Sequence, residues 1–252
     1  MNIKLFGLGL SLALLATTGV YTTPNTPSVE LQTPCTPVNT TIAFDIDKVL
    51  LDRQMYPIFM EYRWDILKNI FRIQLLYNVG KLLYQNATET AYIELFKAQA
   101  PRLAEMVDRI VHEKTPMPGM PELVGHIHDR AYNLVLASNM SAKNLLFYQQ
   151  KFPELFSNFS YAKVVGRDQN GIESCKKPSL EYFQELNTEL AANGLAKPNL
   201  IFIDDKKENV DAFATQAKKD QKESNYRGVQ FKNAAQLQAE LATLGILTAV
   251  NA

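Results

Sequence analysis

The chain has 252 residues, of which 46% are hydrophobic and 21% are charged, so it is long enough to bury one sizeable core. Lys and Arg together number 26, as do Asp and Glu, so no overall basic field exists to attract nucleic acid or anionic lipid. This balance disfavours a nucleic-acid-binding function.

The first 22 residues have the pattern of a secretory signal peptide. Lys4 precedes an apolar stretch from Leu5 to about Val20 that is short for a membrane span and is interrupted by Ser11, Thr17 and Thr18. We therefore expect export to the periplasm or outside the cell, with no stable membrane association after cleavage. An uncleaved N-terminal membrane anchor is the alternative, because the stretch has a single positive charge and no clean A-x-A cleavage site.

Residues 23–39 are rich in Pro and Thr and have no apolar period, which predicts an extended linker. The folded domain is then expected to begin near Thr40. The chain has two cysteines, Cys35 in this linker and Cys175 in the second half. In an oxidising compartment they could form a disulfide, and two unrelated thiols are the alternative.

The stretch from Thr41 to Leu51, TIAFDIDKVLL, begins with the composition of a buried strand. Ile42 to Phe44 are apolar, Asp45 follows them directly, and Asp47 comes two residues later. In an open α/β sheet the ligand site lies outside the carboxyl ends of the parallel strands. The two acids are therefore candidate site residues.

Residues 53–114 show no convincing strand and carry apolar side chains at helical spacing, which predicts a small all-helical unit. The chain after this unit alternates between the two kinds of element. The expected strands are 133–137, 161–165, 199–203 and 227–231, and the expected helices are 121–129, 142–150 with Ser141 as N-cap, 179–192, 208–218 and 234–244. This alternation predicts a Rossmann-like α/β fold, with a parallel sheet covered by helices on both faces and formed by residues 40–52 and 115–252.

Four short stretches follow one another in an informative order. They are DIDKV from Asp45, ASN from Ala137, KKPSLEYF from Lys176 and FIDDKKENV from Phe202. The series resembles the successive motifs of the haloacid dehalogenase superfamily, whose members are mostly phosphohydrolases. The resemblance covers residues 40–231, and the helical insertion at 53–114 is similar to the first class of cap in that superfamily.

The resemblance implies a role for each motif residue, and the chemistry of phosphoryl transfer calls for the same types of group. Asp45 would be the nucleophile, and Asp47 the general acid and base. Mg²⁺ prefers oxygen ligands, which the Asp45 and Asp205 carboxylates and the Asp47 backbone carbonyl would supply. The remaining motif residues are assigned to the phosphate (Ser138, Asn139 and Lys177) and to orienting the metal ligands (Asp204 and Asn209).

Some residues have more than one interpretation. Lys176 is the alternative to Lys177, but the lysine of the motif directly precedes Pro, which selects Lys177. Lys48 stands where the superfamily usually has Gly, and it could either point to solvent or shape phosphate binding. The three histidines do not have the spacing of metal ligands on a helix, so we predict that they lie at the surface (His112, His126 and His128).

These assignments predict a Mg²⁺-dependent phosphatase that hydrolyses a small phosphomonoester through an aspartyl phosphate. A phosphomutase on the same fold is one alternative, since the cap and not the motifs separates it from a hydrolase. A non-catalytic exported binding module that kept the site by descent is another. The retained acids argue against a dehalogenase, which needs no metal. The oligomeric state is not predicted by the sequence.

Overall fold

The computed structural model describes residues 34–53, 57–68, 97, 100–165, 175–222 and 225–248. The predicted signal peptide and the first part of the predicted linker lie outside these residues. None of the helices in the described part of the chain has the length and hydropathy that a membrane span requires.

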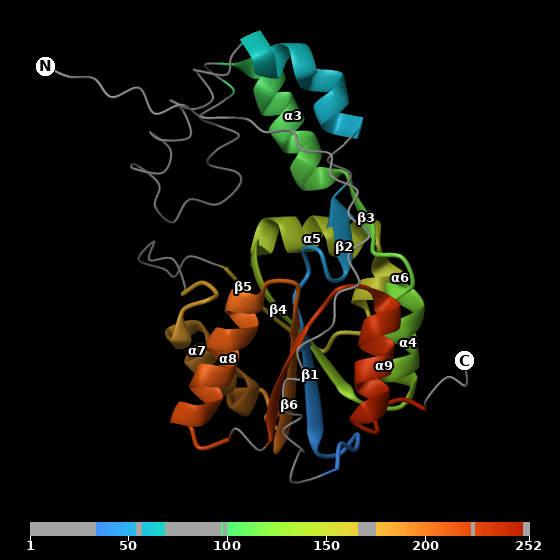
Figure 1. Cartoon of the computed structure of the whole chain (residues 1–252), viewed down its shortest axis with the longest axis vertical. Helices are drawn as coiled ribbons and strands as arrows, with labels where there is room; N and C mark the ends of the chain where they lie inside the picture. Colours follow the sequence, from blue (N-terminus) through green and yellow to red (C-terminus); the bar gives the residue numbers. More distant parts are fainter. Residues whose placement is uncertain are drawn as a thin grey trace, which may run out of the picture. The chain divides into compact units, whose positions relative to one another are not determined.

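A five-stranded parallel sheet forms the centre of the fold (Figure 1). Its strands lie in the order β5-β4-β1-β6-β7, so the first strand is central and is paired on both sides. Their bounds are Thr40–Phe44 for β1, Asn133–Ser141 for β4, Tyr161–Val165 for β5, Asn199–Asp204 for β6 and Tyr226–Gln230 for β7. All four expected strands of the second half are present, and β4 runs past its predicted end at Ala137.

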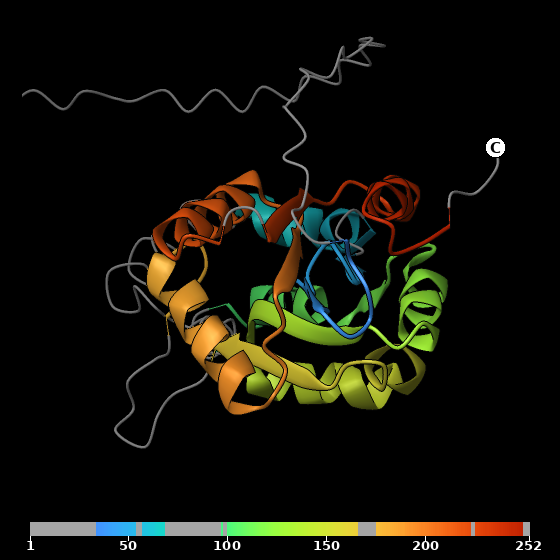
Figure 2. The ribbon, with the colours of Figure 1, turned by 90° about the horizontal axis from the view of Figure 1, so that it is seen from below.

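Helices cover both faces of this sheet, as predicted, and Figure 2 shows them around the strands from below. One face packs against α7 and α8, and the other against α4, α5, α6 and α9. The bounds are Met120–Asp129 for α4, Ala142–Lys151 for α5, Pro153–Phe156 for α6, Leu180–Ala192 for α7, Lys207–Lys219 for α8 and Ala234–Thr243 for α9. The four-residue helix α6 was not predicted. Ser141 caps α5 as expected, because its hydroxyl accepts from Asn144 N.

Burial explains why residues 42–44 of β1 form a continuous apolar run. Every residue of β1 is buried, with Ile42 and Phe44 on one face and Ala43 on the other. The small side chain of Ala43 shares its face with Phe183, Phe202 and Phe213, whose ring centroids lie 5.2 to 5.5 Å apart. A central strand covered on both sides has no solvent face, so hydrophobic residues do not alternate with polar ones.

The end of the predicted linker belongs to the folded core. Cys35 is 6% exposed and packs with the residues of β1, and Asn39 O accepts from Asn199 N at 2.9 Å. Thr36 N donates to Asn39 Oδ1 at 2.8 Å, which closes a turn before β1. The expected start of the fold at Thr40 is therefore too late.

Two short strands, β2 (Leu51–Arg53) and β3 (Lys114–Pro116), pair antiparallel at the two ends of the predicted helical unit. The prediction of no strand in this part of the chain is therefore wrong at its borders. Between them, residues 57–68 are helical and α3 spans Pro101–His112. These helices share a small apolar cluster and a 2.6 Å ion pair from Arg109 to Glu61. The proposed division of the chain into core and cap stays a prediction.

Candidate active site

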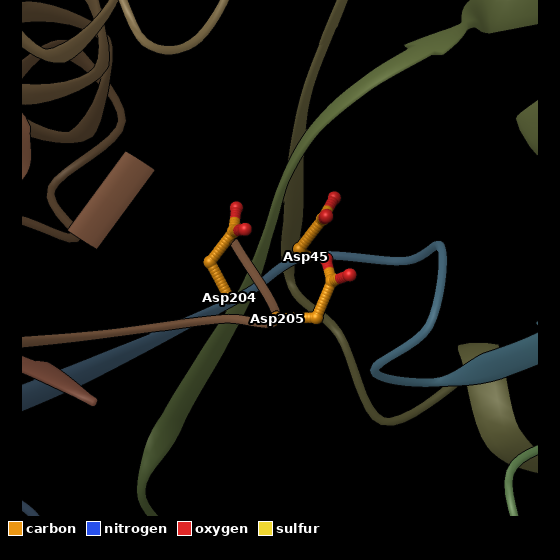
Figure 3. Close-up of side chains that lie close together, drawn as sticks. All are labelled: Asp45, Asp204 and Asp205. Atoms are coloured by element: carbon orange, nitrogen blue, oxygen red, sulfur yellow. The ribbon is translucent and has the colours of Figure 1, made fainter. Parts of the chain in front are cut away.

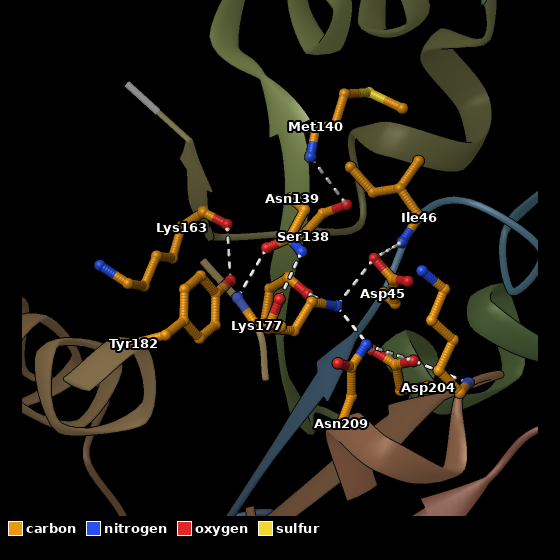
Figure 4. A network of polar contacts seen from close by, with 12 residues as sticks. Asp45, Ile46, Ser138, Asn139, Met140, Lys163, Lys177, Tyr182, Asp204 and Asn209 are labelled. Carbon is orange, nitrogen blue, oxygen red and sulfur yellow. Dashed lines mark hydrogen bonds and ion pairs between the residues drawn. The ribbon is translucent and has the colours of Figure 1, made fainter. Parts of the chain in front are cut away.

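The candidate site lies where the three adjacent central strands end. Because β1 lies between β4 and β6, residues that follow the carboxyl ends of all three meet at one edge of the sheet. Asp45 follows β1 and its backbone N donates to Ile203 O of β6 at 2.9 Å. Ser138 lies on β4 and Asp204 ends β6. Figure 4 shows their side chains converging with Lys177. The sequence prediction that these motifs meet is thus matched by their positions.

Asp45 is a buried carboxylate, 6% exposed, at the centre of this group. Its Oδ1 accepts from Ile46 N at 2.8 Å and lies 3.0 Å from Lys177 Nζ. Burial raises the pKa of Asp45, and the charge of Asp204 adds to this, whereas the Lys177 cation and the Ser138 hydroxyl oppose it. The ionised form therefore depends on the cations that the site supplies.

Lys177 joins the two buried carboxylates. Its Nζ lies 2.6 Å from Asp204 Oδ2 and 3.0 Å from Asp45 Oδ1, and it also donates to Ala137 O at 2.8 Å. The side chain is 1% exposed. The structure therefore places Lys177 beside Asp45 and Asp204, and its predicted role in binding phosphate stays a prediction. The peptide bond between Lys177 and Pro178 is cis.

Asn139 fixes the backbone of Lys177. Its Nδ2 donates to Lys177 O at 2.9 Å, and its Oδ1 accepts from Lys177 N at 2.9 Å. Both polar ends of the amide are engaged in this contact, and the second N–H of Nδ2 is the donor that a phosphate would have to use. This clamp was not anticipated, and the phosphate-binding roles of Asn139 and Ser138 stay predictions.

Asp204 is fully buried and its two oxygens are held by three donors. Asn209 Nδ2 lies 2.9 Å from both oxygens, Lys206 N donates to Oδ1 at 2.9 Å, and Lys177 Nζ donates to Oδ2. A carboxylate held in this way can orient its neighbours. These contacts hold Asp204 in place, and the metal-orienting role of Asp204 and Asn209 stays a prediction.

The structure brings three carboxylates together at this edge of the sheet. One oxygen each of Asp45, Asp204 and Asp205 lies within 4.8 Å of the others (Figure 3). Burial raises the pKa of Asp205, and the charge of Asp204 raises it further. An all-oxygen set of carboxylates that repel one another fits a hard divalent cation such as Mg²⁺. The expected contribution of the Asp47 backbone carbonyl stays a prediction.

Asp47 lies beside a residue that the sequence did not single out. Its Oδ1 is 2.5 Å from the amine of Lys114, which is completely buried in β3. The two are separated by 67 positions along the chain. Because β2 and β3 are each three residues long, the sequence carries no periodic signal that would have placed Lys114 near Asp47.

Lys48 adopts a left-handed backbone conformation, with φ of 64°. This conformation favours glycine, which accounts for the usual Gly at the position in the resembling motif. The residue is exposed, and its backbone N donates to Leu51 O at 2.7 Å in the turn. Of the two interpretations, the exposure favours a side chain that points to solvent.

Both cysteines are free in the structure. Cys35 packs in the cluster on one face of the sheet, and Cys175 packs against the cluster on the other face. The possible disulfide is therefore not formed.

The three histidines differ in exposure. His126 and His128 are exposed as predicted, whereas His112 is partly buried and its Nδ1 lies 3.2 Å from Asp108 Oδ1.

No protein-family model and no curated protein matches the chain. Solved structures do. A protein from Porphyromonas gingivalis named as a HAD-like family hydrolase matches with a TM-score of 0.54 at 18% identity, over 82% of this chain and 98% of that one. The chain has the fold of the haloacid dehalogenase (HAD) superfamily. This confirms the resemblance drawn from the motifs and the fold class predicted from the alternation of strands and helices.

Two further HAD structures contain ions. YfnB from Bacillus subtilis, named as a HAD-hydrolase and bound to magnesium, has a TM-score of 0.52 at 16% identity, over 81% of this chain and 98% of that one. A HAD family hydrolase from Deinococcus radiodurans R1 with bound phosphate and sodium has a TM-score of 0.51 at 12% identity, over 85% of this chain and 100% of that one. At these identities the likeness establishes the HAD fold, while the chemistry rests on the residues of this chain.

Proposed function

We propose that the protein is a Mg²⁺-dependent phosphatase that hydrolyses a small phosphomonoester through an aspartyl phosphate on Asp45. The observation that carries the proposal is the buried group formed by Asp45, Lys177 and Asp204, with Asp205 beside it. A binding module has no need to hold a lysine between two buried carboxylates, because each buried charge is costly. A site that stabilises transferred charge requires such groups.

In the proposed reaction an Asp45 carboxylate oxygen attacks phosphorus. The bond to the leaving-group oxygen breaks, and that oxygen takes its electron pair and a proton from Asp47. Asp47 then removes a proton from water, whose oxygen attacks phosphorus and displaces Asp45. Free phosphate leaves, and both carboxyl groups return to their starting states.

The other groups stabilise charge during both steps. Lys177 is fixed by Asn139 and Asp204, so its positive charge is held beside Asp45, where the phosphoryl group would be transferred. Mg²⁺ bound by Asp45 and Asp205 would neutralise phosphoryl charge and orient the group for attack. Asp204 and Asn209 would keep the lysine and the acids in place.

The experiment is hydrolysis of para-nitrophenyl phosphate and an alkyl phosphate by the purified protein, with Mg²⁺ and with EDTA. We expect release of phosphate that requires Mg²⁺. Phosphoryl transfer to a second hydroxyl compound in place of water would support the phosphomutase alternative. No turnover on a broad panel of phosphomonoesters would support the binding module, and release of halide from a 2-haloacid without metal would support a dehalogenase.

Mg²⁺ should raise the melting temperature of the protein in the absence of phosphate. The Asp45 and Asp205 carboxyl groups have raised pKa values, so each is held in its ionised form at a cost that a bound cation removes. At saturating Mg²⁺ we expect a shift of roughly 3 to 8 °C by calorimetry.

The matched variants are Asp205→Asn, which should lose most of this shift, and Asp211→Asn, an exposed change on α8 that should keep it. Equal melting temperatures of the wild-type protein with Mg²⁺ and with EDTA would contradict the metal site.

We also propose that the protein is exported and acts on its small phosphorylated substrate outside the cytoplasm. The basis is the apolar stretch after Lys4. N-terminal sequencing of the protein from the extracytoplasmic fraction should give a mature start between about Thr17 and Thr23. Recovery of the full-length chain from membranes would support the uncleaved anchor, and recovery from the cytoplasm alone would overturn export.

A further inference from the structure

Lys114 is a completely buried cation outside the four motifs. Its amine lies 2.5 Å from Asp47 Oδ1 and 5.3 Å from the ring centroid of Tyr148, which is itself completely buried. Burying an ammonium group is strongly unfavourable unless a charge and a suitable surface compensate it. In its ionised form, which the proposed reaction produces at the first proton transfer, Asp47 supplies the charge, and the Tyr148 ring supplies the surface.

The backbone that carries Lys114 is held from two directions. In β3, Lys114 is paired with Arg53 of β2, and Met117 N donates to Leu50 O at 2.8 Å. From α5, Lys151 Nζ donates to Lys114 O at 3.3 Å and to His112 O at 3.0 Å. The Lys114 side chain therefore extends from a backbone position that is fixed on both sides.

Asp47 lies in a turn whose backbone is also fixed, since Leu50 N and Leu51 N both donate to Ile46 O. Its side chain is 25% exposed, in contrast to the buried Asp45. A partly exposed carboxylate on a turn has several accessible rotamers. A group that transfers protons has to be within hydrogen-bond reach of the reacting oxygen.

We propose that Lys114 is a positioning residue that holds the Asp47 carboxylate, through its contact with Oδ1, in place for proton transfer. The inference rests on the proposed function, because it concerns the acid and base of that reaction. Lys114 belongs to the short strand β3 that follows α3, so the chain that leaves the helical segment contributes the residue that positions the acid.

The test compares Lys114→Met with the matched variant Lys163→Met. Methionine keeps the length of the side chain and its contact with an aromatic ring. Lys163 is a second buried lysine, 3% exposed, on β5, where it pairs with Glu185 and Glu189 at 2.9 and 2.8 Å. It therefore controls for the loss of a buried, paired cation.

For Lys114→Met we expect kcat on an alkyl phosphate to fall about 10- to 100-fold, with a much smaller fall on para-nitrophenyl phosphate and little change in KM. The reason is that an alkoxide leaving group needs the proton from Asp47, whereas an aryl oxide scarcely does. In the Asp47→Asn background, Lys114→Met should lower kcat by less than about 2-fold, because the group it positions is gone. Lys163→Met should affect both substrates equally.

Equal losses on both substrates, or a full multiplicative loss in the double variant, would show that Lys114 supports only the fold. If the wild-type protein hydrolyses neither phosphate, the proposed function fails, and melting temperatures then decide the pairing. Asp47→Asn should lower the melting temperature by roughly 5 to 10 °C by leaving a buried cation unpaired, and adding Lys114→Met should restore most of it. No restoration would overturn the pairing itself.

Discussion

Asp45→Asn should abolish turnover and leave the protein folded. The amide is not a nucleophile toward phosphorus and carries no charge for a metal, so we expect a fall in kcat of about 10⁴-fold or more. The fold should tolerate the change because Asn has nearly the same shape, and burial already disfavours the charge of Asp45. Lys177 keeps Asp204 as a partner at 2.6 Å.

Phosphate release measures the activity of this variant, and circular dichroism with a melting curve measures its fold. Asp211→Asn is the matched control, since that carboxylate is exposed and pairs with Lys207 on α8. Activity of Asp45→Asn within a few-fold of the wild type, with Mg²⁺ present, would mean that another group attacks phosphorus.

Lys177→Met should cause the largest loss of stability of any single site variant. The ammonium compensates two carboxylates, of which Asp204 is completely buried and Asp45 nearly so. Removing one partner of a buried ion pair costs about 3 to 5 kcal/mol, because the remaining charge stays buried without compensation. Activity should fall as well, since a fixed cation for the phosphoryl oxygens is lost.

Urea unfolding in EDTA measures the free energy of unfolding without the effect of a metal. The neighbouring Lys176 gives the matched variant, because it is the other candidate for the motif lysine and does not share the burial of Lys177. Lys176→Met should change stability by less than about 1 kcal/mol and keep most of the activity. The reverse ranking of the two variants would assign the motif lysine to position 176.

The sheet could be predicted because each strand satisfies local rules. Residues 42–44 and 200–203 are runs of apolar residues between polar ones, and the acids Asp45 and Asp204 follow them directly. Alternation with helices then implies a parallel sheet, and a parallel sheet gathers its carboxyl ends. The convergence of the motifs on one edge follows from topology alone.

The contacts within the site could not be predicted in the same way. Asn139 was expected to face phosphate, but whether its amide turns toward phosphate or toward the backbone of Lys177 depends on a chain segment 38 positions away. Lys114 sits in the polar sequence HEKTP, and three paired residues are too few for a strand signal. The contact of Asn139 with Lys177 and the position of Lys114 both depend on packing between distant parts of the chain. A local sequence pattern carries no information about such packing.

The conformation of Lys48 shows a different limit. The sequence shows that Lys48 stands where the resembling motif usually has Gly. The positive φ of this residue explains why Gly is usual there. The sequence alone could not separate a backbone requirement from a role in phosphate binding. Only the conformation of the turn makes that distinction.

The most direct test of the central claim is chemical trapping of the intermediate. The protein is quenched during turnover of para-nitrophenyl phosphate with Mg²⁺, and borohydride then reduces any acyl phosphate to the alcohol, which converts an aspartyl phosphate to homoserine. Peptide mass spectrometry should find homoserine at position 45, dependent on both substrate and Mg²⁺ and absent from Asp45→Asn. Steady turnover with no homoserine at position 45, or with the modification at another carboxylate, would contradict the assignment of Asp45 as the nucleophile.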